Sequence, residues 1–249
     1  MVLPKKLKNW LGIRHCTFLI LLVCLLSGKV GGQNPYFNQA IDLPDNELYL
    51  SVMPTDSGYL CQGNRFLNGM GKNYLVWLDE NLDTIQTRTY FADVQGLFYT
   101  SWNDQPIISS DYMFLSGTKE IGAPYQNATL IKLNMLGDTI ATFSYDYGDY
   151  SFFSCGVPSE KGVVVAGAVR IGGSQYDILM AEIDTNGNVL WDSQFGYPTS
   201  SENSYGIDTT ANGGYIVAGY KQTTEWDTYV AHTDSLGNLK WQQTYGYPE

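Results

Sequence analysis

The sequence repeats with a period of about fifty residues. A strand-like apolar phrase that ends in glycine occurs four times, as GYLCQG (58–63), YMFLSG (112–117), GVVVAG (162–167) and GYIVAG (214–219). A turn-like phrase follows each copy and opens on Asp79, Asn134, Asp184 and Asp234. Two independent markers that share one period indicate a tandem array in which each unit is a single supersecondary module.

Within a unit, apolar and polar residues alternate with a period of two. Leu239, Trp241 and Tyr245, for example, are separated by polar residues. This alternation is typical of half-buried β-strands, and no stretch after residue 32 shows an apolar stripe of helical period. The last unit is accordingly predicted to contain four strands, at about 204–210, 214–221, 227–234 and 239–245.

Four short antiparallel strands in about fifty residues are typical of one blade of a β-propeller. A β-solenoid would need shorter coils, and a sandwich would not repeat one module so regularly. We therefore predict an all-β, propeller-like array of four four-stranded units, at about 44–96, 97–150, 151–202 and 203–249. The phrase GYIVAG is expected to form an inner strand, where its small residues would allow a close approach near the axis.

The last two units, GGYIVAGY (213–220), WDTYVAHTDSLGNLKW (226–241) and TYGYP (244–248) above all, resemble the repeats of secreted propeller-like proteins. Such proteins occur in Gram-negative bacteria that use the type IX secretion route. The resemblance is weaker in the first two units, where Gln86 and Ala141 replace the tryptophan and Leu82 replaces the turn glycine. Proteins of this type often end in a C-terminal sorting domain, which residues 33–249 lack.

An open array of sheets leaves strand edges unpaired. We expect residues 33–249 to be part of an incomplete propeller. The alternative is that the four units close on themselves, with Phe37–Leu43 supplying a closing strand to the last unit.

Residues 1–32 resemble a secretory signal peptide. Lys5, Lys6, Lys8 and Arg14 precede the apolar run 16–26, and small residues allow cleavage before Gln33. Eleven apolar residues are too few to span a bilayer as a helix. The chain is therefore predicted to be secreted, or displayed on the outer cell surface, with no membrane span after cleavage.

The charge balance argues against nucleic-acid partners. Removal of residues 1–32 would leave nine of the 14 Lys and Arg and all 25 Asp and Glu, a net charge of −16. Such a surface repels phosphate backbones. Only Cys61 and Cys155 remain after cleavage, so the chain is not a disulfide scaffold, and the sequence leaves open whether the two form one disulfide.

The segment DTNGNVLWDSQFGYP (184–198) returns as DSLGNLKWQQTYGYP (234–248) and resembles the start of an EF-hand loop. The glutamate that such a loop needs at position 12 is replaced by Phe195. A hairpin turn explains more, because the Asp can cap the turn and Gly187 can adopt a positive φ. No metal or cofactor site is predicted.

Aromatic residues are the best candidates for ligand binding. Trp191 and Trp241 are in phase with the apolar positions and are expected to pack between units. Tyr176 and Trp226 occupy equivalent loops before the third strand of their units, where an aromatic can stack on a sugar or anchor a protein contact.

Catalysis has little support from the sequence. His232 is the one histidine outside the predicted signal peptide, and no nucleophile motif accompanies it. We predict a non-enzymatic binding or adhesion scaffold whose partners are glycans or cell-surface proteins. The alternatives are a propeller-fold glycoside hydrolase, which needs only two suitably spaced carboxylates, and a structural spacer in a larger adhesin.

Overall fold

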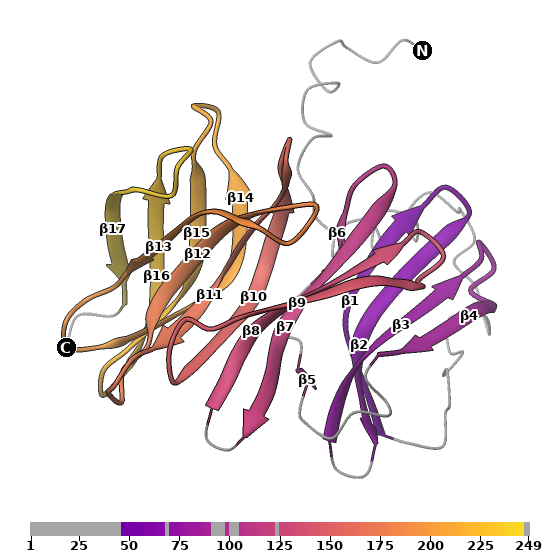
Figure 1. Ribbon diagram of the computed structural model, residues 1–249, viewed down its shortest axis with the longest axis horizontal. Helices are drawn as coiled ribbons and strands as arrows, with labels where there is room; N and C mark the ends of the chain where they lie inside the picture. The colour runs from indigo at the N-terminus through magenta and orange to yellow at the C-terminus, as the bar shows by residue number, and fades with distance from the viewer. Residues whose placement is uncertain (1–45, 68–69, 91–97, 100–104, 123–124, 247–249) are drawn as a thin grey trace, which may run out of the picture. The chain divides into compact units, whose positions relative to one another are not determined.

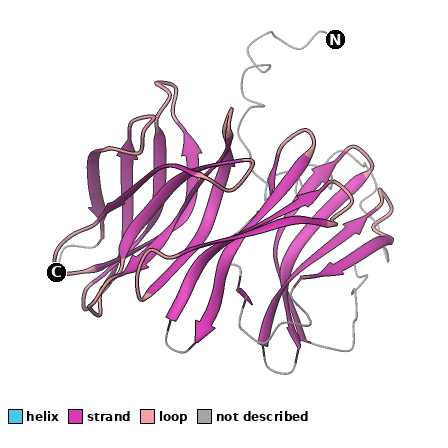
Figure 2. Cartoon of the chain, in the orientation of Figure 1, coloured by secondary structure: helices cyan, strands magenta, loops and turns pink. Residues whose placement is uncertain are grey.

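The computed structural model describes residues 46–67, 70–90, 98–99, 105–122 and 125–246. Contacts divide the chain into residues 1–42 and 43–249, and every described residue belongs to the second part. The predicted signal peptide and the strand predicted at Phe37–Leu43 lie outside the described residues. In the described part all regular structure is β, as predicted, and no helix long and apolar enough to cross a membrane is found there (Figure 2).

Each repeat unit is an antiparallel meander of consecutive strands (Figure 1). Unit one contains β1 (Asn46–Thr55), β2 (Gly58–Leu67), β3 (Met70–Leu78) and β4 (Thr84–Thr89). Unit two contains β6 (Ile107–Ile108), β7 (Tyr112–Gly122), β8 (Tyr125–Asn134) and β9 (Thr139–Tyr145), and the short β5 (Phe98–Tyr99) also pairs with β7.

The other two units follow the same plan. Unit three contains β10 (Tyr150–Pro158), β11 (Gly162–Arg170), β12 (Asp177–Asp184) and β13 (Val189–Phe195). Unit four contains β14 (Ser201–Thr209), β15 (Tyr215–Gln222), β16 (Trp226–Thr233) and β17 (Leu239–Tyr245), close to the four strands predicted there. A single parallel pair, Tyr150 with Gln126, joins units two and three into one nine-stranded sheet.

In units one, three and four, the glycine that ends the repeated apolar phrase lies opposite a β-bulge. The register of β10 against β11 shifts just after Phe153, beside Gly167. A Cβ on Gly167 would lie 1.8 Å from the carbonyl oxygen of Phe152, and one on Gly219 would lie as close to that of Asn203. Glycine is therefore required by the bulged neighbouring strand. The phrase forms the second strand of its unit, and its glycine is needed for close approach to the first strand. The approach near a propeller axis stays a prediction.

Neighbouring units share apolar cores. Units two and three enclose Phe114, Leu130, Phe153, Val165 and Leu179, which are all buried. A second core of the same kind lies between units three and four, and a third lies between units one and two. Each sheet face that meets a neighbour is therefore apolar, as the alternating pattern predicted.

Candidate interaction surface

The repeated D-x-x-G-N segment is a hairpin turn in which the first side chain caps the backbone. Oδ1 of Asp184 accepts hydrogen bonds from the N–H groups of Asn186 and Asn188, both at 2.8 Å. Gly187 has a φ of 88°. The prediction of a hairpin turn is thus confirmed, with the carboxylate of Asp184 capping its own turn.

The same turn also contacts the preceding unit, a role that the sequence did not reveal. A Cβ on the turn glycine Gly137 would lie 2.5 Å from Cη2 of Trp77 in unit one. At Gly187 the equivalent distance is 2.2 Å, to Cδ1 of Phe143 in unit two, and at Gly237 it is 2.3 Å, to Cζ3 of Trp191 in unit three. We call this contact the turn seat: a turn glycine of one unit that lies directly on an aromatic ring of the unit before it.

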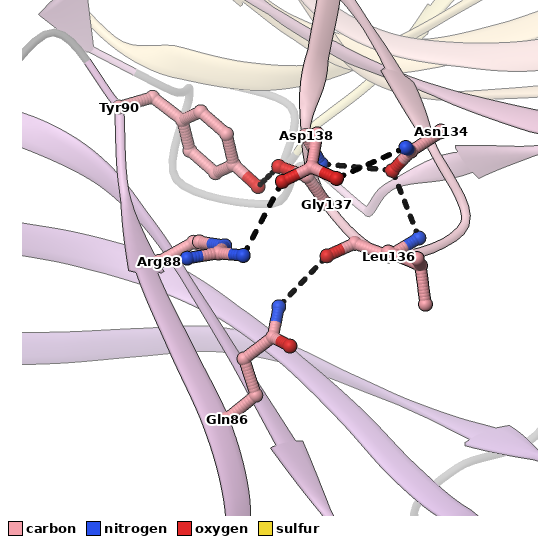
Figure 3. Close-up of polar contacts among 7 residues, drawn as sticks. All are labelled: Gln86, Arg88, Tyr90, Asn134, Leu136, Gly137 and Asp138. Atoms are coloured by element: carbon pink, nitrogen blue, oxygen red, sulfur yellow. Dashed lines mark hydrogen bonds and ion pairs between the residues drawn. The ribbon is translucent and has the colours of Figure 1, made fainter.

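Polar contacts accompany the ring at the seat between units one and two (Figure 3). The buried Tyr90 hydroxyl donates to the carbonyl oxygen of Gly137 at 2.9 Å, and Nε2 of Gln86 donates to that of Leu136 at 2.7 Å. Arg88 and Asp138 form an ion pair at 3.3 Å, but both side chains are about half exposed, so solvent screens it. Burial raises the pKa of the Tyr90 hydroxyl, which therefore remains a donor at neutral pH.

The seat between units two and three has the same design. The Tyr145 hydroxyl donates to the carbonyl oxygen of Gly187 at 3.1 Å, and Nζ of Lys132 donates to that of Thr185 at 2.9 Å. Between units three and four, Phe195 replaces the tyrosine. The Tyr197 hydroxyl donates to the carbonyl oxygen of Gln242 at 3.4 Å, but Gln242 lies on β17, outside the turn.

The ring under the glycine does not come from one fixed position. In unit three it is Trp191, on the outer strand β13. Gln86 and Ala141 occupy the matching register positions of units one and two, since Trp77 pairs with Gln86 as Glu182 pairs with Trp191. Those units supply the ring from Trp77 on β3 and Phe143 on β9. The turn seat therefore forms in units that have no tryptophan at the position of Trp191.

In unit four, the sheet face that receives the next unit's turn in units one to three is exposed to solvent. Tyr215 and Val217 of β15 are buried against unit three, so the residues that alternate with them point away from it. We call this side the outer face of unit four: Ile216, Ala218, Tyr220, Trp226, Thr228, Val230, His232, Trp241, Gln243 and Tyr245.

The outer face of unit four is much more exposed than the matching faces of units one and three. Tyr245 is 53% exposed, whereas Tyr90 and Phe195, at the matching positions of units one and three, are 6% and 8% exposed. Trp241 is 46% exposed and stacks on His232, with the ring centroids 5.7 Å apart. Among the described residues, no turn covers this ring. Trp191 packs between units as predicted, whereas the same prediction for Trp241 is wrong, because no unit in the described part of the chain packs on it.

The structure gives the two predicted binding residues different surroundings. The ring of Tyr176 is half buried, with Tyr150 edge-on at 5.6 Å and the Arg170 guanidinium 5.3 Å away. Its backbone carbonyl accepts the N–H of Glu202, so it belongs to the joint between units three and four. Trp226 is 61% exposed, and its ring centroid lies 4.4 Å from that of Tyr220. Only Trp226 therefore offers an open ring.

A buried carboxylate, not singled out by the sequence, lies in the joint between units three and four. Glu202 has no exposed surface and accepts hydrogen bonds from the Ser200 hydroxyl and the Tyr197 N–H. Burial raises its pKa, the two hydrogen bonds oppose that shift, and the charge of Asp177 adds to it. Ser151 occupies the same register position in unit three. A glutamate where the neighbouring repeat has a serine was the one sign of this site in the sequence.

A shallow cavity of about 200 Å³ lies beside this carboxylate. Its lining is Val169, Ile171, Gly173, Ser174, Gln175, Asp177, Tyr197 and Pro198. Asp177 lines the cavity, and its carboxylate lies near that of Glu202: a Cβ on Gly196 would be 2.5 Å from Oδ1 of Asp177 and 2.4 Å from Oε2 of Glu202.

The described residues contain no group of three or more His, Cys, Asp and Glu side chains placed to hold a metal ion. Cys61 and Cys155 both remain thiols, so the disulfide between them that the sequence left open does not form. Within the described part of the chain, Nδ1 of His232 has no hydrogen-bond partner, and its ring stacks on Trp241.

Comparisons with known proteins do not assign a family. No family model matches the chain, and no curated protein matches it. Among solved structures the chain is similar to one described as the crystal structure of the eukaryotic initiation factor, with 8% identity and a TM-score of 0.33. That match covers 78% of this chain and spans 54% of the length of the other. A similarity this low says nothing about function.

Proposed function

We propose that this chain is a secreted or surface-displayed, non-enzymatic binding scaffold built from propeller-like repeat units, and that the outer face of unit four binds a protein partner. The observation that supports the proposal is the exposure of Trp226, Trp241 and Tyr245 on one sheet face, at 61%, 46% and 53%. Large aromatic side chains gathered on an exposed surface are typical of interaction sites.

The composition of the face favours a protein over a glycan. Ile216, Ala218 and Val230 lie between the rings, so apolar residues from two strands join the aromatic rings, with Thr228, His232 and Gln243 among them. Protein interfaces are typically centred on aromatic anchors surrounded by such residues. A sugar would use the open Trp226 ring alone, by stacking, and the formal charge of −11 for the whole chain makes phosphate-rich partners unfavourable.

The experiment is to probe arrays of cell-surface proteins and of glycans with residues 33–249. Trp226→Ala should reduce binding at least tenfold, because truncation of an exposed aromatic anchor removes most of its contact area. The matched control is Tyr125→Ala, since Tyr125 is similarly exposed, at 50%, but lies in unit two.

Three outcomes would overturn the proposal. One is the absence of any ligand, as the spacer hypothesis predicts. Another is equal binding by wild type and Trp226→Ala. The third is turnover of chromogenic glycosides that is abolished in Asp177→Asn, which would establish the hydrolase instead. Binding to glycans alone, lost in Trp226→Ala, would keep the scaffold and replace its partner.

A further inference from the structure

We propose that the outer face of unit four is a docking surface for one more repeat unit of the same kind, received through the glycine of its D-x-x-G-N turn. This inference rests on the proposed binding role of the face and names its partner. The three turn seats within the chain are the template, because each places a turn glycine on an aromatic ring of the unit before it.

Unit four carries the parts of a complete seat. Trp241 occupies the register position of Trp191, whose ring lies under Gly237. Tyr245 occupies the position of Tyr145, whose hydroxyl donates to the carbonyl oxygen of Gly187. Unit four therefore combines the tryptophan of one seat with the hydroxyl donor of another. Both rings are about half exposed and no turn covers them among the described residues.

The apolar surface around this seat continues the pattern of the existing joints. Val164, Ala166 and Met180 of unit three are buried against unit four. Their counterparts in unit four are Ile216, Ala218 and Val230, which lie on the outer face. The seat and its surroundings are thus equivalent to an interface that the chain already makes.

The turn of unit one is excluded as the occupant, and with it a head-to-tail second copy of this chain. That turn has the same capping hydrogen bonds, from the N–H groups of Asn81 and Asp83 to Oδ1 of Asp79. Leu82, however, replaces the glycine, at a φ of 68°. A Cβ at this position of the other turns would lie 2.2–2.5 Å from a ring carbon, well inside van der Waals contact. A turn with leucine therefore cannot rest on Trp241.

The experiment extends the chain by a second copy of residues 200–246, joined after Glu249, which keeps the fifty-residue spacing of the repeat. The chain is labelled with 5-fluorotryptophan, and the ¹⁹F NMR line of Trp241 is assigned by its loss in Trp241→Phe. Docking should shift this line and reduce its broadening by a soluble paramagnetic quencher at least fivefold, because the added turn covers the ring. The matched control carries Gly237→Leu in the added copy only, and its Trp241 line should remain where it is in the unextended chain.

A second readout tests the hydroxyl donor. Tyr245→Phe in the original unit should increase the undocked fraction of the extended chain about fivefold, the effect expected from one hydrogen bond. Equal quenching of Trp241 in the extended chain and the leucine control would overturn the inference. So would self-association of the unextended chain through Trp241, measured by sedimentation, because it would make a second copy the occupant.

The two proposals fail separately. If the extended chain does not dock its added unit, but the arrays show a protein ligand that depends on Trp226, then the inference is wrong and the proposed function stands. If docking occurs and nothing on the protein and glycan arrays binds, the face serves to join repeat units. The function as a receptor for other proteins is then refuted.

Discussion

Gly187→Ala is the substitution that most directly tests the turn seat. Gly187 has a φ of 88°, and a Cβ there would lie within 2.6 Å of three atoms of the Phe143 ring. The Phe143 ring must therefore move, and the carbonyl oxygen of Gly187 moves with the turn, away from the Tyr145 hydroxyl at 3.1 Å. The matched control is Gly213→Ala, because Gly213 has a φ of 81° but nothing within 4 Å of its Cβ position.

The expected magnitudes follow from these contacts. A left-handed backbone costs an L-residue about 1–2 kcal/mol, and both variants carry this cost. Only Gly187→Ala also crowds an aromatic ring, at about 1–3 kcal/mol, and weakens a hydrogen bond worth about 1 kcal/mol. We expect the free energy of unfolding to fall by about 3–6 kcal/mol in Gly187→Ala and by about 1–2 kcal/mol in Gly213→Ala.

Urea unfolding followed by circular dichroism and by tryptophan fluorescence measures both variants against wild type. The decisive quantity is the difference between the two losses, which isolates the seat from the shared backbone strain. A difference below about 0.5 kcal/mol, the usual effect of a neutral surface change, would show that the turn glycine serves only its own hairpin.

Leu82→Gly should raise the free energy of unfolding by about 0.5–1 kcal/mol, because relief of the positive φ exceeds the added chain entropy of glycine; a lower thermal midpoint would contradict it. Tyr90→Phe should lower that free energy by about 1–3 kcal/mol, since it leaves the buried carbonyl oxygen of Gly137 without its donor; unfolding by urea measures it. The raised pKa of Glu202 means that the folded protein releases this proton at higher pH than the unfolded chain. The contribution of Glu202 to the stability of wild type therefore falls as the pH rises above about 4.5. Stability curves of wild type and Glu202→Gln should therefore diverge in favour of the variant towards neutral pH, and parallel curves would refute the assignment.

The period, the strands and the turns could be predicted because each depends on local chemistry. Alternation of apolar residues places strands, and an Asp followed three residues later by a glycine makes a capped hairpin wherever it occurs. Asp184 and Gly187 behave as expected for that reason. The propeller itself stays a prediction, because the described sheets do not form a closed ring.

The seat could not be predicted because it depends on two units at once. Gln86 and Ala141 replace the tryptophan of the repeat, which suggested that units one and two lack its contact. Trp77 and Phe143 instead place a ring under the next turn from other register positions. The sequence shows an aromatic in each unit, yet only the packing shows which one lies under the next turn. Likewise Tyr176 and Trp226 were correctly matched to each other, whereas their different exposure follows from having or lacking a neighbour.

The exchangeable origin of the ring also limits how such arrays can be recombined. A unit moved to a new place would bring its turn glycine, but the ring beneath that turn belongs to whichever unit then precedes it. A preceding unit with no aromatic at any of the positions used by Trp77, Phe143 and Trp191 would leave the glycine over a void. The portable building block is therefore a pair of adjoining units, and a chimaera cut between complete repeats would have to restore one ring at each new junction.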